Sequence, residues 1–364
     1  MKIIKILFFI LTILFNTKVF SISVTFINPG KSDEDFWVTS SKFTQAAAKS
    51  LGIDLEVLYA ERNRVLNVKI AEELSQRTKK PDFVFIVNEK LLAEEMLQIL
   101  DKYKIKTFLI HSDLVPEQKK NLSNPREVLK NWIATIVPDN VFAGHLIAKG
   151  VYDTAKQNKK LNTYNLIAIH GDKATPTSQE RNLGLQKFLK ENPKINLKQS
   201  LYAEWNKDIA YEQTKIILQR YNDINMIWAA NDPIAIGALK AAQESKKSPG
   251  KDIFIGGLNW LNEAIQSVKD NKLAISVGGH FMNGACALIV LYDYVKGIDL
   301  KEKDHKIEIK VFSSVNSKEA QNFSQLMKEE HWSKIDFKRF SKFHNKTLKT
   351  YNFNSKKILN TLKK

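Results

Sequence analysis

Short apolar runs alternate with longer stretches of helical periodicity along most of the chain. Within the longer stretches, apolar side chains recur every three to four residues, which is the spacing of one helix face. This spacing predicts helices at 42–51, 67–76, 89–103, 141–156, 178–191, 210–221, 235–244, 262–270 and 283–295. Runs rich in β-branched and aromatic residues predict strands at 23–27, 54–59, 83–87, 107–110, 165–169, 226–229, 253–256 and 274–277.

The alternating strands and helices fall into two sets. Strand–helix repeats form βαβ units with parallel sheets, so the sets at 22–135 and 140–275 predict two doubly wound α/β lobes. No long linker separates them, and 136–140 is a candidate crossing between the lobes. The chain after about residue 306 differs: a predicted strand at 306–312 precedes a stretch rich in Lys, Asn and Phe, for which we predict no placement.

The first 21 residues have the features of a signal peptide. Lys2 and Lys5 form a charged start, 6–15 is an apolar run too short to span a bilayer comfortably, and 19–21 resembles a cleavage site. An uncleaved N-terminal anchor is the alternative. We therefore expect export to the periplasm and a mature chain of about 340 residues, enough for two lobes.

Composition and charge add two constraints. The chain has one cysteine, Cys286, so no intramolecular disulfide forms, and the apolar run around it predicts a core position. The net charge is +17, and loss of the three lysines in 1–21 leaves +14. Because the lysines are spread along the chain, we interpret the charge as a solvated surface and expect no nucleic-acid partner. The charge also favours an acidic partner or an anionic membrane face.

Polar and aromatic residues follow the predicted strands. In doubly wound lobes, ligands bind beyond the carboxyl ends of the strands. Planar polar side chains bond vicinal hydroxyls and aromatic faces pack on sugar rings, so this set suits a polyhydroxylated ligand. The positions are Asn28, Asp33, Phe36, Trp37, Glu61, Arg62, Asn88, His111, Ser112 and Asp113 in the first lobe, and 170–181, Trp205, Asn231, Asp232, Asn259, Trp260, Gly279 and His280 in the second.

The sequence lacks the motifs of the common serine hydrolases, phosphate-binding loops and zinc proteases. Its seven histidines are scattered, and none pairs with another His or with Cys at metal-ligand spacing. Asp33 and Asp113 are the one candidate glycosidase pair, but strand-end carboxylates are more often hydrogen-bond acceptors. We predict a binding protein rather than an enzyme, with no cofactor and no metal.

Several stretches resemble those of the type I periplasmic sugar-binding proteins, the ribose- and galactose-binding group that serves ABC importers. They are FINPGKSDEDFWVTSSKFTQAAAKSLG, IVPDNVFAGHLIAKGVY, TSQERNLGLQKFL, MIWAANDPIAIGALKA, DIFIGGLNW and KLAISVGGHFMNGA. The resemblance covers 22–313 and implies two doubly wound parallel-sheet lobes joined by a multi-strand hinge. It divides the chain into an N-terminal lobe (22–137 and 279–305), a C-terminal lobe (138–278), a hinge strand (306–313) and a basic C-terminal extension (314–364).

The resemblance also implies roles for single residues. Phe36 and Trp37 would stack on the ligand; the alternative is that either one is a hydrophobic staple for the next helix. Asn28 and Asp33 would bond ligand hydroxyls. Arg181 would hold further hydroxyls from a helix start, where a cation is unfavourable unless it meets an acceptor.

Four positions further along the chain carry less specific implications. Asn231 matches the family's ligand amide, whereas Asp232 either contacts ligand or caps the next helix. Asn259 stands where sugar-binding members often have Asp. His280 stands near a position where they often have Gln or Asp.

One further departure and one further aromatic residue complete the predicted site. Residues 111–113 replace an Asp-Arg pair often seen after the fourth strand, which leaves Asp113 as the candidate contact. Trp205 is either a second aromatic wall or part of the core. The predicted ligand-binding residues are therefore Asn28, Asp33, Phe36, Trp37, Asp113, Arg181, Trp205, Asn231, Asn259 and His280.

The resemblance implies a periplasmic solute-binding protein that captures a sugar-like ligand between its lobes and delivers it to the permease of an ABC importer. The ligand would bridge the lobes and stabilise the closed form. The departures at 111 and 259, with the basic extension, leave an alternative in which a membrane sensor kinase or cyclase reads the closed form. We expect a monomer whose small ligand is a sugar or polyol.

Overall fold

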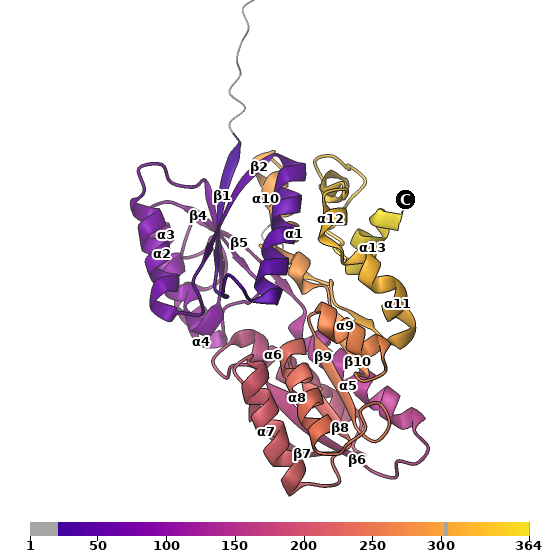
Figure 1. Ribbon diagram of the computed structural model, residues 1–364. Coiled ribbons are helices and arrows are strands. Elements are labelled where there is room, and N and C mark those ends of the chain that lie inside the picture. The colour runs from indigo at the N-terminus through magenta and orange to yellow at the C-terminus, as the bar shows by residue number, and fades with distance from the viewer. Residues whose placement is uncertain (1–20, 302–304, 364) are drawn as a thin grey trace, which may run out of the picture.

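The computed structural model describes residues 21–301 and 305–363, which form two α/β lobes, one above the other in Figure 1. Each lobe is built on a six-stranded sheet, which confirms the predicted fold class. The predicted signal peptide, 1–21, lies outside these residues except for Ser21. Among the described helices, none has the length and apolar character that a membrane span requires.

The first sheet is parallel throughout, in the order β11-β5-β4-β3-β1-β2. Strands β3 and β5 are buried at every position, as expected for a parallel sheet covered on both faces. The strands are β1 (Ile22–Asn28), β2 (Ile53–Tyr59), β3 (Phe83–Val87), β4 (Lys106–Ile110), β5 (Trp132–Pro138) and β11 (Lys306–Ile309). The helices of this lobe are α1 (Asp35–Leu51), α2 (Arg64–Gln76), η1 (Glu89–Leu91), α3 (Ala93–Lys102), α4 (Pro116–Leu122), η2 (His280–Met282) and α10 (Asn283–Val295).

The second sheet has the order β12-β10-β9-β8-β6-β7 and is parallel except for β12, which runs antiparallel to β10. Its strands are β6 (Tyr164–His170), β7 (Ile195–Tyr202), β8 (Met226–Ala229), β9 (Phe254–Leu258), β10 (Ile275–Gly278) and β12 (Ser313–Val315). The helices of this lobe are α5 (Asn140–Gln157), α6 (Pro176–Glu191), α7 (Lys207–Arg220), α8 (Asp232–Glu244) and α9 (Asn262–Lys269).

All eight strands predicted at 23–277 are present within two residues of their predicted ends. Three further strands were not predicted: β7, β12 and most of β5. Strand β7 (INLKQSLY) is a polar edge strand with little alternation, and the end of β5 was interpreted as part of the crossing. Of the strand predicted at 306–312, Lys306–Ile309 is present as β11 in the first sheet, whereas β12 of the second sheet begins at Ser313, beyond the predicted end.

Four helices of the two lobes begin at a capping side chain that lies one to four residues after a strand. The side chains of Asn63, Asp139, Asn206 and Asn231 each accept a hydrogen bond from a backbone N–H in the first turn. Each cap satisfies an otherwise unpaired donor of the helix start. The short strand–cap–helix loops therefore place polar residues at the carboxyl ends of the strands, where the two lobes face each other.

The chain crosses between the lobes three times, after β5, after β10 and between β11 and β12. At the second crossing, Gly279 has φ +116°, and a Cβ there would lie 2.2 Å from the carbonyl oxygen of Val311. Only glycine fits this position without distortion. We propose that the lobe boundaries lie at the first two crossings, 137/138 and 278/279.

The C-terminal extension, 314–363, packs against both lobes (Figure 1, yellow). Trp332 and Phe337 of the extension lie against Phe43 of α1, with ring centroids 5.1 and 5.5 Å apart. In the second lobe, Phe323 packs on Trp260 at 4.5 Å. The extension therefore spans the hinge on one side of the molecule. Its elements are α11 (Ser317–Leu326), α12 (Glu329–Trp332), η4 (Phe337–Phe340), α13 (Ser355–Asn360) and η5 (Thr361–Lys363).

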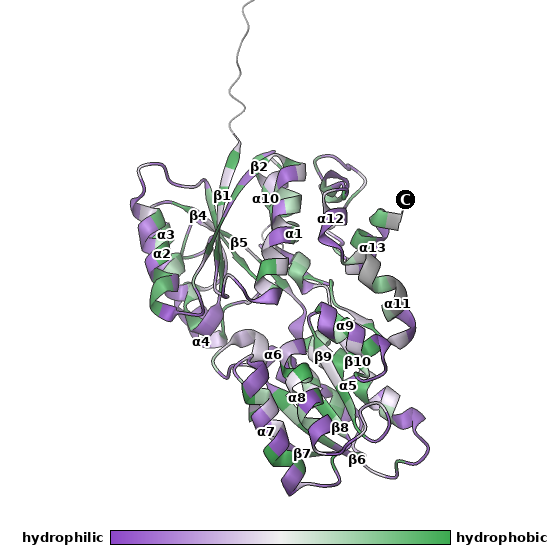
Figure 2. Ribbon diagram, viewed as in Figure 1, coloured by the Kyte–Doolittle hydropathy of each residue, from purple (hydrophilic) through white to green (hydrophobic). Residues whose placement is uncertain are grey.

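Hydropathy separates the inside of each lobe from its surface. Figure 2 shows hydrophobic strands at the centre of both lobes and hydrophilic residues on the outer faces of the surrounding helices. Cys286 is buried on α10, which confirms its predicted core position, and burial raises the pKa of its thiol.

Candidate ligand-binding cleft

A cavity of about 590 Å³ lies between the lobes and is lined by loops at the carboxyl ends of strands from both sheets. This volume falls within the usual range for small-molecule sites. Eight of the ten predicted site residues line it: Asp33, Phe36, Trp37, Arg181, Trp205, Asn231, Asn259 and His280.

The other two predicted residues, Asn28 and Asp113, lie outside the lining and have structural partners instead. Asn28 is fully buried: its amide donates to Ser41 Oγ at 3.0 Å, and its Oδ1 accepts from the backbone of Gly30 at 2.9 Å. The carboxylate of Asp113 forms ion pairs with Lys119 and Lys306 at 2.7 and 2.8 Å. These bonds hold the loops after β1 and β4 in shape, and they occupy the atoms that a ligand would need.

Phe36 and Trp37 form an aromatic wall in the first lobe. Trp37 is buried and packs edge-on against His111, with ring centroids 5.2 Å apart. Phe36 stacks on His280, 4.4 Å away with ring planes 18° apart. A Cβ on Gly30 would lie 2.0 Å from the Trp37 ring, so this glycine makes the room that the indole needs. Both aromatics line the cleft, and Trp37 is also part of the core.

Trp205 faces the cleft from the second lobe. It is half-buried and lies over Gly171, where a Cβ would come within 2.3 Å of its ring carbons. The guanidinium carbon of Arg181 lies 5.6 Å from the indole centre, within the range of a cation–π contact. Trp205 therefore forms a second aromatic wall. Its position depends on Gly171, the residue directly after β6.

This dependence gives the first prediction. Gly171→Ala should push the Trp205 ring into the cleft and weaken ligand binding by about tenfold or more, equivalent to roughly 1.4 kcal/mol. Isothermal titration calorimetry would measure the change. Gly150→Ala is the control, because it creates a similar overlap, 2.2 Å from Ile275, outside the cleft lining. It should lower stability without a change in affinity. Equal affinities for the wild type and Gly171→Ala would contradict the prediction.

Arg181 is buried at the floor of the cleft, 3% exposed. It projects from the first turns of α6, which crosses α5 so closely that a Cβ on Gly144 would lie 1.9 Å from the Arg181 carbonyl oxygen. Its Nη1 donates to the carbonyl oxygen of Ala230 at 2.8 Å, while its Nε has no partner among the described residues. Burial lowers the pKa of Arg181 to about 9. The side chain is thus held in place by one hydrogen bond, and its Nε donor has no partner in the described structure.

Asn231 takes both of the roles considered for this pair, and Asp232 takes neither. The Asn231 Oδ1 caps α8 by accepting from the backbone of Ile234 at 3.0 Å, and its side chain lines the cleft. Asp232 is fully buried beneath, where it accepts hydrogen bonds from Ser276 Oγ and the backbone N–H of Leu261, both at 3.0 Å. Burial raises the pKa of Asp232 to about 7. Asn231 is therefore the residue that can offer an amide N–H₂ to a ligand.

The two histidines of the cleft are neutral at physiological pH. Burial lowers the pKa of His111 to about 3 and that of His280 well below its usual value, and the charge of Arg181 adds to both shifts. Neutral imidazole rings can donate or accept a hydrogen bond. They add hydrogen-bonding capacity to the floor but no charge.

A third histidine, His170 at the end of β6, supports a prediction about pH. It is 1% exposed and packs between the rings of Tyr202 and Trp228, and burial lowers its pKa to about 4. The unfolded chain binds a proton near pH 6.5 and folded His170 does not, so its contribution to stability falls as the pH drops from 6.5 toward 4. His170→Gln should lack this loss. From pH 7 to pH 5, the unfolding free energy of the wild type should fall by about 2 kcal/mol relative to that of His170→Gln.

Urea denaturation of both proteins at the two pH values would measure this difference. Comparison with the variant cancels the pH-dependent contributions of the other titrating groups. One of these is Asp232, whose raised pKa makes its contribution to stability rise as the pH falls. A difference that stays constant with pH would show that folded His170 takes up a proton as readily as the unfolded chain does.

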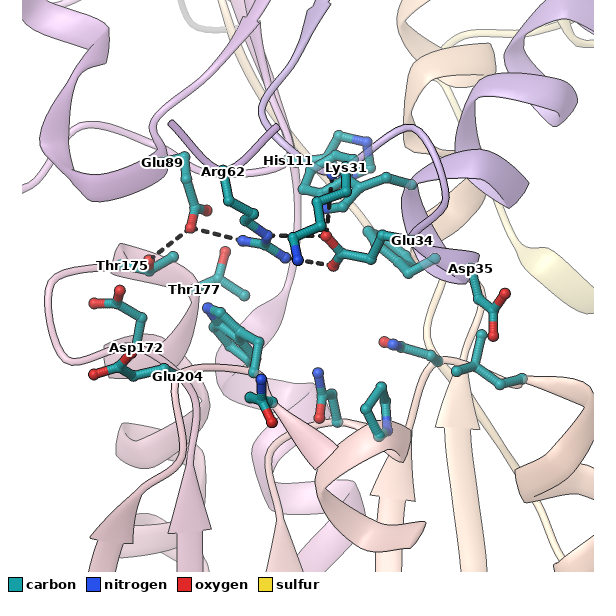
Figure 3. Close-up of a pocket in the computed structure, with 18 of the residues that line it drawn as sticks. Lys31, Glu34, Asp35, Arg62, Glu89, His111, Asp172, Thr175, Thr177 and Glu204 are labelled. Carbon is teal, nitrogen blue, oxygen red and sulfur yellow. Dashed lines mark hydrogen bonds and ion pairs between the residues drawn. The ribbon is translucent and has the colours of Figure 1, made fainter. Parts of the chain in front are cut away.

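A charged cluster at one end of the cleft was not predicted as a site. Figure 3 shows Arg62 between Glu34 and Glu89. Arg62 donates two hydrogen bonds to Glu34, at 2.5 and 2.9 Å, and one to Glu89 at 2.9 Å. Burial raises the pKa of Glu89, and the charge of Arg62 opposes that shift. Arg62 was a strand-end candidate, but its partners lie 27 and 28 residues away, and no sequence spacing indicates the pairing.

The same end of the cleft carries direct contacts between the lobes. Thr175 of the second lobe donates to Glu89 at 3.2 Å, and Lys90 pairs with Asp172 at 3.7 Å (Figure 3 shows the first contact). Beside them the hydroxyl groups of residues 112 and 177 are 2.5 Å apart. The structure therefore has the lobes in contact on one side of the cavity.

Backbone strain is concentrated around the cleft. Among the residues that the structure describes, fourteen non-glycine residues have positive φ, and nine of them lie in loops at the carboxyl ends of strands. Each costs roughly 1–2 kcal/mol, so the surrounding fold must hold it in place. Such loops present their side chains at fixed angles to the cavity. The nine are Glu61, Arg62, Lys90, Leu91, His111, Glu204, Trp205, Asn259 and Trp260.

Known proteins share this fold and this chain organisation. The family model of the periplasmic binding protein domain matches residues 24–299. The crystal structure of a periplasmic sugar-binding protein from Pseudomonas fluorescens is 34% identical, with a TM-score of 0.83, and the match covers 93% of this chain and 99% of that one. The D-allose-binding periplasmic protein of Escherichia coli K12 is 24% identical over 77% of this chain and 87% of its own length. The ribose import binding protein of Haemophilus influenzae is 23% identical, over 77% and 88%.

The chain belongs to the periplasmic binding protein family, and its predicted membership of the type I sugar-binding group is confirmed. The match to the Pseudomonas fluorescens protein covers more of this chain than residues 1–313 could supply, so that similarity reaches into the C-terminal extension.

Proposed function

We propose that the protein captures a sugar-like ligand in the cleft, in the periplasm, and delivers it to an ABC importer. The observation that carries the proposal is a set of buried polar atoms that belong to residues lining the cleft and have no partner within the described protein. Such atoms are costly unless a ligand or water satisfies them, and sugars present hydroxyls at the edge of an apolar ring face. The atoms are Trp37 Nε1, Asn140 Oδ1, Arg181 Nε, Trp205 Nε1 and His280 Nδ1.

Ligand binding in this scheme favours the closed arrangement of the lobes. Residues of both lobes line the same cavity, so a ligand that bonds to both lobes adds contacts that exist only when the lobes are together. The contact of Thr175 with Glu89 and the pair Lys90–Asp172 stabilise the same arrangement. Import is supported by relatives whose names describe a ribose import binding protein and an allose-binding periplasmic protein. The sensor alternative gains no support from these relatives.

The proposal is tested by thermal unfolding of residues 22–364 with a panel of pentoses, hexoses, furanoses, polyols and nucleosides. A ligand at 100 times its dissociation constant should stabilise the fold by about 2.7 kcal/mol. Trp205→Ala should lose the shift, whereas Tyr103→Ala, an exposed aromatic outside the lining, should keep it. Chromatography should recover the ligand unchanged. A folded protein that responds to no member of the panel would refute sugar capture, and turnover of the ligand would refute a pure binding role.

The delivery step needs a separate test in cells. Deletion of the gene should abolish uptake of the labelled ligand identified in the panel, and a plasmid copy should restore it. Unchanged uptake, together with a lost transcriptional response to the ligand, would contradict import and support the sensor alternative.

A further inference from the structure

Arg181 differs from the other buried charges of the cleft because it has no ionic partner. In the described part of the chain its side chain forms no ion pair, and its one protein hydrogen bond goes to the carbonyl oxygen of Ala230. By contrast, buried Glu89 is paired with Arg62 at 2.9 Å and accepts from Thr175. A buried ion without a partner is strongly unfavourable. Closure of the cleft therefore calls for an anionic group near Arg181.

The two carboxylates whose charges act on Arg181 are bound elsewhere. Asp232 accepts from Ser276 and from a backbone N–H, and burial raises its pKa to about 7. Glu180 accepts from the Asn140 amide at 2.9 Å, and burial raises its pKa as well. Neither carboxylate forms an ion pair with Arg181 in the described structure, so each acts on it only from a longer distance.

The floor of the cleft also has more donors than acceptors. Arg181 Nε, Trp37 Nε1 and Trp205 Nε1 are buried N–H groups without a partner in the described structure. Asn231 has committed its oxygen to the cap of α8, which leaves its N–H₂. Against these donors, the enclosed and unpartnered amide oxygen among the described lining residues is that of Asn140, while the Asn259 amide and the histidine rings can supply either role. A ligand that matches this floor must be rich in acceptors, and a carboxylate is an acceptor only.

Acidic side chains at the rim do not reverse this preference. Glu34 and Glu89 are neutralised in part by Arg62, and Asp172 by Lys90. The other rim acids are exposed, so water and salt screen their charges from the buried floor. They are Asp33, Asp35, Glu204, Asp208 and Glu263.

We propose that the ligand is a sugar acid, a polyhydroxylated carboxylate, whose carboxylate pairs with Arg181 while its hydroxyls meet the amides and indoles of the cleft. This inference rests on the proposed function, because it assumes that the cleft binds a sugar-like solute. A carboxylate matches the planar guanidinium fork and supplies the charge that the floor lacks. A neutral sugar would leave the buried cation uncompensated when the lobes close.

Matched pairs of ligands test the proposal by calorimetry at pH 7.5 and constant ionic strength. The pairs are D-galactose with D-galacturonate, D-glucose with D-glucuronate and D-ribose with D-ribonate, and D-glucosamine serves as a cationic probe. In at least one pair the acid should bind at least about 30-fold more tightly than the neutral sugar. This factor corresponds to about 2 kcal/mol from the added charge-assisted hydrogen bonds. Arg181→Gln should abolish that preference, and Lys215→Gln, which removes a surface charge of the same lobe, should retain it.

The outcomes separate this inference from the proposed function. Tighter binding of a neutral sugar or of D-glucosamine would overturn the sugar-acid proposal and leave sugar capture standing. Binding of no ligand in any pair, by a folded wild-type protein, would overturn both. An acid preference that persists in Arg181→Gln would also overturn the assignment, because the charge would then be recognised elsewhere. Circular dichroism checks that the variant is folded, and Arg181→Lys, which keeps the charge, should retain part of the preference.

Discussion

Replacing Arg181 with glutamine should abolish tight ligand binding and, at the same time, leave the ligand-free protein as stable as the wild type or more stable. The loss of affinity should be about 100-fold or more, roughly 3 kcal/mol, because acceptors of the bound ligand would face a site without its charged donor. The gain in stability follows from burial, which lowers the pKa of Arg181 to about 9 and so marks its charged form as unfavourable in the fold.

The opposite signs of the two effects make the prediction specific. Calorimetry with the best ligand of the panel gives the affinity, and urea denaturation without ligand gives the stability. Arg62→Gln is the matched control in the same cleft, since it would leave Glu89 buried without its ionic partner and should lower stability by about 3–5 kcal/mol. If Arg181→Gln lowered stability as much as Arg62→Gln does, Arg181 would have to be a structural residue.

The fold was predictable because its signal is local. Most strands of the two sheets are short apolar runs, and most helices have a periodic apolar face, so the βαβ order can be identified from one segment at a time. The polar edge strand β7 escaped for the same reason, since its residues (INLKQSLY) carry little alternation. The C-terminal extension could not be placed, because its docking depends on scattered aromatics such as Trp332 and Phe337 meeting α1 some 290 residues earlier in the chain.

The candidate site was predictable in position but not in detail. The topology brings strand ends together, so residues such as Trp37, Arg181 and Trp205 reach one cavity. Asparagine and aspartate, however, serve equally well as loop anchors and ligand contacts. Asn28 and Asp113 follow strands as a ligand residue would, yet their side chains are occupied by the backbone of their own loops and by two lysines. The deciding factor is which neighbours the folded chain supplies, and that is not encoded in spacing.

The second prediction with a large effect concerns the anchor of the extension. Asp293 on α10 is fully buried, and its carboxylate accepts four hydrogen bonds from the extension. The donors are the hydroxyl groups of Ser341 and Tyr351 and the backbone N–H groups of Lys342 and Phe343. Four donors on one buried carboxylate explain how it is stable without a cationic partner in the described structure.

Asp293→Ala should therefore lower the unfolding free energy by about 3–5 kcal/mol, because it removes the common acceptor and leaves the donors of the 341–351 segment to be desolvated without it. The thermal midpoint should fall on the order of 10 °C. Differential scanning calorimetry would give the midpoint. Hydrogen exchange would locate the damage, with faster exchange expected in 341–353 and in the α1 and α10 surfaces that the extension covers.

Tyr292→Phe is the matched control, since it removes only the neighbouring hydrogen bond to His344, 3.0 Å long, and should cost about 1 kcal/mol. A loss below that of the control, with exchange in 341–353 unchanged, would show that the extension is held by its aromatic contacts alone.

Because Ser355 of α13 lies against Gly279 and bonds Ser313 at 2.9 Å, release of the extension would also free one side of the hinge. The expected pattern, lost stability with faster exchange at both 279–282 and 311–315, would identify Asp293 as the point through which α10 holds the extension across the hinge.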